Sequence, residues 1–159
     1  MSCYTCFFIR RENDFVPIGS FSRNHSTARA FSDYHFEAPW EKISALTAKD
    51  IQEVIAGVME NKQFDLNTID KYEKKIAEIK SMDASLSERM EMIDEYRGYI
   101  EEVRDDYEEW DYAHNFLSFL LGILDEVRYS GYDEDKKYDV DNYIYFGLEI
   151  GHPTVNDIV

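Results

Sequence analysis

Apolar side chains recur at alternating steps of three and four between Ser85 and Arg128, the spacing of a helix that packs along another helix. Ser85 and Glu88 form the S-x-x-E pattern of a capping box, which marks where such a helix begins. At 1.5 Å per residue this stretch predicts a helix about 65 Å long. Its apolar seam consists of Ile93, Tyr96, Ile100, Val103, Tyr107, Trp110, His114, Leu117, Leu121 and Leu124.

A second helical pattern precedes the first. Thr47 and Asp50 resemble a capping pair, and the apolar residues that follow share one helical face. The period is interrupted over residues 61–67 and then resumes, so either one helix continues through a stutter or it breaks near Asp65 and restarts at a cap on Asn67 or Thr68. The short connection before Ser85 predicts antiparallel neighbours, so residues 47–129 should form a helical hairpin.

The two arms need not match in length. If the first arm begins at Thr68, it spans only about 20 Å. The rest of the long seam must then pack on the Thr47–Asn61 helix, on a β-layer or on another copy of the chain. Packing on another copy would make the protein a homo-oligomer, which is the state we expect.

The chain ends carry strand patterns. Residues 3–11 and 15–21 are rich in aromatic and β-branched side chains on either side of a polar turn, which predicts a β-hairpin, and Pro17 indicates that the second strand is short or at an edge. A short helix is expected through residues 28–31, capped by Ser26 or Thr27. Pro39 is expected to open another that buries Trp40. Residues 142–150 alternate as a strand that should join the hairpin, and Thr154 with Asp157 predicts a final helical turn.

These elements predict an α+β fold, in which a small antiparallel sheet, made by the N-terminal hairpin and the C-terminal strand, accompanies a long antiparallel helical hairpin. We expect residues 1–159 to form a single domain, with residues 1–46 and 140–159 as a β-rich layer with short helices.

The charge of the chain is unevenly placed. The net charge is -16, and residues 1–50 are balanced, whereas residues 101–141 hold fourteen acidic and four basic side chains. Such a surface repels nucleic acid and anionic membranes and attracts basic partners. No window is apolar enough for a membrane span and no signal-peptide pattern opens the sequence, so we expect a cytoplasmic protein.

Paired carboxylates on the long helix fall at positions that should face solvent. Rows of carboxylates on a rigid helix can imitate nucleic acid phosphates, so we expect a non-enzymatic interaction protein that binds a basic, nucleic-acid-binding partner protein, as phage-type inhibitors do. The plainer alternative is that these charges only keep the protein soluble. The expected partner-binding residues are Glu101, Glu102, Asp105, Asp106, Glu108, Glu109 and Tyr112.

A group of basic residues near the N-terminus supports a second hypothesis. Arginine forks and hydroxyls beside a helix start are the ingredients of an anion site, so the chain could instead bind or sequester a small anionic ligand or nucleotide. The alternative is that these arginines pair with the acidic helices. The residues are Arg10, Arg11, Arg23, His25 and Arg29.

No pattern of catalytic, metal or cofactor chemistry is complete. Cys3 and Cys6 form one C-x-x-C without further ligands, and the aspartates of residues 133–141 do not follow the calcium-loop spacing. His114 on an apolar seam is typical of a packed side chain satisfied by one hydrogen bond. We therefore expect no enzyme activity, no metal and no cofactor. A third hypothesis is an oligomeric structural or assembly protein that uses the apolar seam.

Overall fold

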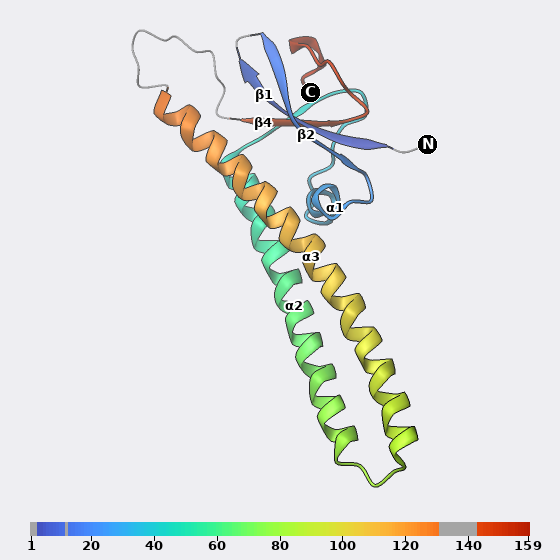
Figure 1. The fold of residues 1–159 in the computed structure, drawn as a ribbon. Helices are drawn as coiled ribbons and strands as arrows, with labels where there is room; N and C mark the ends of the chain where they lie inside the picture. Colours follow the sequence, from blue (N-terminus) through green and yellow to red (C-terminus); the bar gives the residue numbers. More distant parts are fainter. Residues whose placement is uncertain (1–2, 12, 131–142) are drawn as a thin grey trace.

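The protein is an α+β structure in which a four-stranded antiparallel sheet lies at one end of a long helical hairpin (Figure 1). The computed structural model describes residues 3–11, 13–130 and 143–159. Its strands are β1 (Tyr4–Arg11), β2 (Asp14–Ser22), β3 (Ser44–Leu46) and β4 (Ile144–Leu148), in the order β2-β1-β4-β3. Its helices are α1 (Ser26–Asp33), α2 (Ala48–Lys80), α3 (Leu86–Ser130) and a terminal 3-10 turn, η1 (Val155–Asp157).

The predicted hairpin and C-terminal strand are confirmed. β1 pairs with β2 on one side and with β4 on the other. Of the two possibilities that Pro17 left, the structure shows the second, since β2 has nine residues and is an edge strand. The register of this pair shifts between Phe7, which lies opposite Gly19, and Phe8, which lies opposite Pro17. β2 therefore has one extra residue there and forms a β-bulge. Proline and a bulge both reduce the capacity of an exposed edge to pair with another chain.

The segment around Pro39 differs from its prediction. It is not helical, because its backbone groups bond to β4: Leu148 N donates to Pro39 O at 2.8 Å, and Glu41 N donates to Leu148 O at 2.9 Å. Trp40 forms an isolated bridge to Leu148 and is 57% exposed, so the prediction that it is buried in the core is wrong. A following strand, β3, was not predicted; it covers the far edge of β4.

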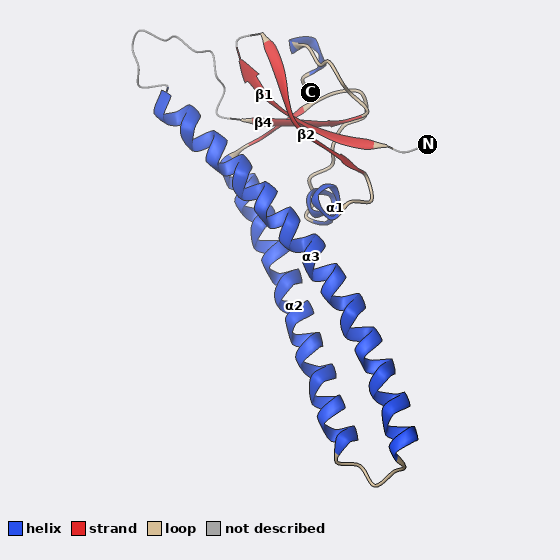
Figure 2. Ribbon diagram, in the orientation of Figure 1, coloured by secondary structure: helices blue, strands red, loops and turns tan. Residues whose placement is uncertain are grey.

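The sheet is buried on both faces. Phe7, Ile144 and Phe146 point to the helices and belong to the main core, which also contains α1 and both long helices. Phe8 and Tyr145 alternate to the other face, where they pack with Ile43 under the C-terminal residues. Figure 2 shows the C-terminal turn on the side of the sheet away from the hairpin.

The first long helix continues without a break. α2 runs from Ala48 to Lys80, and its predicted capping box is present: Thr47 Oγ1 accepts from Asp50 N, and Asp50 Oδ2 accepts from Thr47 N. The predicted start of the second long helix is also correct. Glu88 N donates to Ser85 Oγ, and Ser85 lies one residue before the start of α3. The stutter interpretation holds, and α2 spans about 50 Å.

The long apolar seam is covered within one chain. The part of the seam before Trp110 packs on α2. From Trp110 onward the seam belongs to the main core, together with α1 and the sheet. Ala113 and Leu120, which lie off the predicted seam, are fully buried because α3 is enclosed there on more than one side. The reason for expecting a second copy no longer applies, and oligomerisation remains only a prediction.

Candidate functional site

The outer surface of α3 carries a row of exposed carboxylates where the hairpin leaves the sheet. No cation lies within ion-pair distance of them among the residues that the structure describes. At 3.6 residues per turn they fall within about 120° of arc, on the side of the helix opposite α2. We call this set the acidic row: Glu101, Glu102, Asp105, Glu108 and Glu109.

The acidic row ends against α1. Ser26 Oγ, at the start of α1, donates to Glu109 O at 2.7 Å, and Tyr112, 53% exposed, packs edge-on against the rings of Phe21 and His25. Within α1, His25 is the N-cap, because its Nδ1 accepts from Thr27 N. Ser26 and Thr27, expected as caps, instead lie inside the helix.

Asp106 does not belong to the acidic row, so its expected place on the solvent face is wrong. It turns toward α2, where Trp110 Nε1 donates to Asp106 Oδ2 at 3.1 Å and where its carboxyl is hydrogen-bonded to that of Asp65. Asp65 is only 6% exposed. Burial, then the bond to Asp106 and the negative charge of Asp106, raise the pKa of Asp65 from 3.8 to about 7. Asp65 therefore keeps its proton to a higher pH than an exposed aspartate, because a charged Asp65 would be desolvated and would repel Asp106.

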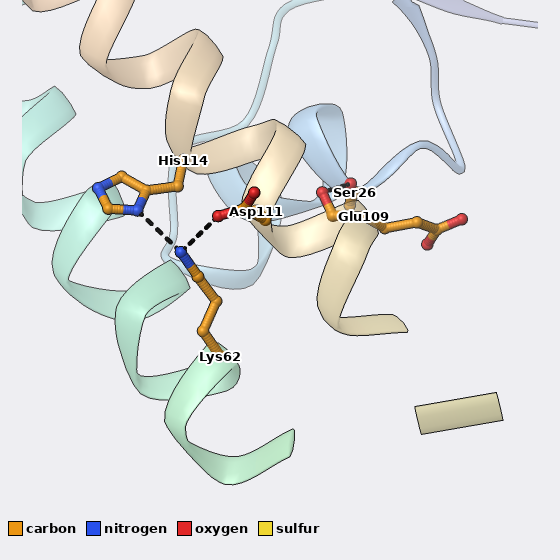
Figure 3. Close-up of polar contacts among 5 residues, drawn as sticks. All are labelled: Ser26, Lys62, Glu109, Asp111 and His114. Carbon is orange, nitrogen blue, oxygen red and sulfur yellow. Dashed lines mark hydrogen bonds and ion pairs between the residues drawn. The ribbon is translucent and has the colours of Figure 1, made fainter. Parts of the chain in front are cut away.

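A second polar contact joins the hairpin one turn further along. Lys62 Nζ lies 2.7 Å from Asp111 Oδ1 and 3.3 Å from His114 Nδ1, and Figure 3 shows the ammonium between the two side chains. An ammonium group only donates, so His114 Nδ1 accepts here. The bond and charge of Lys62 lower the pKa of Asp111. His114 thus makes the one hydrogen bond that a packed histidine was expected to make.

The basic group near the N-terminus is divided by the sheet. Arg10 and Arg11 lie at the end of β1 next to the hairpin turn, whereas Arg23 follows β2 at the opposite end, where Arg23 N donates to Cys3 O. The length of β1, about 23 Å, separates the two ends. Arg29 lies on α1 with its Cζ 5.6 Å from the centre of the Trp110 ring.

Arg23 and Arg29 meet at a cavity of about 410 Å³ between α1, the segment after it and the sheet. Neither forms an ion pair with an acidic side chain within the described ranges, contrary to the expectation that the acidic helices would neutralise them. We call this space the α1 cavity. Sequence reasoning found its arginines but missed its apolar residues, which come from strands and loops far apart in the chain.

The described residues contain no group of three or more His, Cys, Asp or Glu side chains placed to hold a metal ion. Cys3 and Cys6 are free thiols, and the aspartates of residues 133–141 lie outside the described residues. Among the helices that the structure describes, none has a stretch long and apolar enough to cross a membrane. Comparisons of the chain with protein-family models, with curated proteins and with solved structures found no match.

Proposed function

We propose that this protein is a non-enzymatic interaction protein whose acidic row docks on the basic surface of a nucleic-acid-binding protein. The observation that carries the proposal is that five neighbouring carboxylates are exposed and have no cationic partner among the described residues. Unpaired charges of one sign on a small surface raise self-repulsion within the protein, and a complementary partner relieves it.

The spacing of the acidic row supports a phosphate-like surface. The row extends over eight residue steps, about 12 Å of helix axis, so its five charges follow one another at about 3 Å on average. Duplex DNA carries one negative charge per about 1.7 Å of its axis. A protein groove lined with lysine and arginine to bind DNA would therefore meet a comparable charge density on α3.

The position of the row favours recognition without rearrangement. Trp110, directly after Glu109, is buried, and Ser26 binds the backbone of Glu109, so this part of α3 is held by both α1 and the main core. A row fixed on a packed helix loses little conformational entropy on binding. Tyr112 adds a half-exposed aromatic ring next to the charges, a residue type enriched at interfaces.

A competition experiment tests the proposal. The purified protein is titrated into a panel of DNA-binding domains and nucleases that carry a basic groove, each loaded with labelled duplex DNA. We expect it to displace the DNA from a subset of them, with an affinity that falls as salt concentration rises. Failure to displace DNA from every member at low salt would contradict the proposal.

Two variants, each with five substitutions, separate the effect of the acidic row from the effect of total charge. The row variant neutralises the acidic row with Gln and Asn. The control variant neutralises five exposed carboxylates on α2 and has the same net charge: Glu53, Glu60, Asp70, Glu73 and Glu78. We expect the row variant to lose competition and the control to keep most of it. Equal losses in both would mean that charge alone acts, without a specific surface.

The structure also bears on the two alternatives. An oligomeric assembly protein was expected to use the apolar seam, but that seam already packs against α2 and the core, and its residues are buried or half-buried there. A small-ligand function gains a specific observation in the α1 cavity.

A further inference from the structure

The α1 cavity has the size of a small-molecule site. Its volume of about 410 Å³ lies within the range of roughly 300–1,000 Å³ that is usual for such sites. Among its apolar lining residues, Phe36 and Leu148 are half-buried, whereas Phe31 and Phe146 are fully buried with ring centres 5.4 Å apart. The half-buried ring of Phe36 favours a ligand with a flat ring, which can stack or pack edge-on there.

A residue with a hydroxyl group borders this space. Thr5, on strand β1, lines the cavity and is only 4% exposed. Its hydroxyl can donate one hydrogen bond and accept others, so it can bond a polar atom of a ligand in the cavity.

The mouth of the cavity is cationic in a strongly acidic protein. Arg23 and Arg29 line it with one carboxylate, that of Glu37, so its formal charge is +1 while the chain carries -16. The backbone of Arg23 is fixed by its bond to Cys3, but its guanidinium has no ion-pair partner among described residues. A guanidinium recognises carboxylate and phosphate through paired hydrogen bonds.

We propose that the α1 cavity binds a small organic anion that combines one planar, heteroaromatic ring with a carboxylate or phosphate group. The ring lies against Phe36, and the anionic group binds Arg23. Thr5 bonds a polar atom of the ring, and Glu37 accepts from an N–H on its edge. This site is separate from the acidic row and does not depend on the function proposed for it.

Four probes resolve the two chemical components of the ligand. Adenosine 5′-monophosphate has ring and phosphate, indole-3-acetate has ring and carboxylate, adenosine has only the ring component, and inorganic phosphate has only the anion. Binding is followed by amide chemical shifts of the full chain. We expect at least one ring-bearing anion to give saturable shifts at Thr5, Arg23 and Phe31, at least about tenfold more tightly than adenosine or phosphate.

The better of the two ring-bearing anions identifies the source, nucleotide or aromatic carboxylate. The proposal is overturned if neither produces saturable shifts at millimolar concentration, or if inorganic phosphate binds as tightly as both.

Variants assign the roles. Arg23→Gln should weaken binding of the tighter probe by about tenfold or more, because a charge-assisted bond is lost. Thr5→Val, which keeps the side-chain shape, should weaken it by about two- to tenfold. Arg11→Gln, an exposed arginine at the far end of β1, is the matched control and should bind as the wild type does. Melting temperatures show whether each variant is folded, and wild-type affinity in a folded Arg23→Gln variant would overturn the assignment.

Discussion

The buried carboxyl pair between α2 and α3 makes the stability of the hairpin depend on pH. Asp65 has a pKa of about 7 in the folded chain and an ordinary value of 3.8 when exposed. The folded state therefore binds one proton more than the unfolded state between these values, and the free energy of unfolding falls as pH rises through that interval. The stabilisation is complete below pH 3.8 and is lost as pH rises through about 7.

The magnitude follows from the pKa difference. One pKa unit corresponds to about 1.4 kcal/mol, so the whole interval is worth about 4 kcal/mol. The isoelectric point is about 4.5, so a working range of about pH 5.5 to 8.5 keeps the protein away from it. Across that range the free energy of unfolding should change by about 2 kcal/mol because of Asp65. This value is an upper limit, because water near half-buried Asp106 screens the pair.

The assay is urea unfolding followed by circular dichroism, for the wild type and for Asp65→Asn, across this pH range. Asparagine cannot ionise but can still donate to Asp106. We expect Asp65→Asn to gain stability relative to the wild type by up to about 2 kcal/mol as pH rises.

Glu101→Gln is the matched control, since Glu101 is exposed on α3 without an ion-pair partner among described residues, and its difference from the wild type should stay constant with pH. The reasoning is refuted if the Asp65→Asn difference is equally flat, or if the Asp65 carboxyl titrates by NMR near its ordinary pKa.

Two further predictions concern the same hairpin. Gly98→Ala should stabilise the protein by about 0.5–1 kcal/mol, because alanine favours a helix and its methyl group would meet nothing within 4 Å. Gly57→Ala should destabilise it despite the same propensity gain, because the methyl group would lie 1.9 Å from the Tyr34 ring; thermal melting of both variants checks the opposite signs. Lys62→Met should raise the pKa of Asp111 toward its ordinary value by removing its hydrogen bond and nearby positive charge, as followed by NMR titration; an unchanged midpoint would show that Lys62 does not hold this carboxylate.

Local patterns predicted the long helices well because their signals act over short distances. The caps at Thr47 and Ser85 bond to backbone groups three residues away, and the seam repeats every few residues. The segment at Pro39 was misjudged for the opposite reason. Its helical signals are local and weak, whereas hydrogen bonds to Leu148, more than a hundred residues away, determine its extended backbone.

The candidate sites show the same division. The acidic row was predicted because exposure on the outside of a helix follows from the seam. Asp106 could not be separated from it, since its inward turn depends on Asp65 and Trp110 at the crossing with α2. The α1 cavity brings Thr5, Arg23 and Phe146 together from three parts of the chain, and no spacing in the sequence records that neighbourhood.

The sequence by itself determined the α+β class, the helical hairpin with its caps and the negative charge of α3. These follow from periodicity and from composition. Only the tertiary structure decided that α2 covers the seam within one chain, that Asp65 is buried beside a second carboxyl between the helices, and that one arginine pair borders a cavity while another lies at the far end of the sheet. Burial and desolvation depend on which distant segments meet, and that is set when the hairpin packs on the sheet.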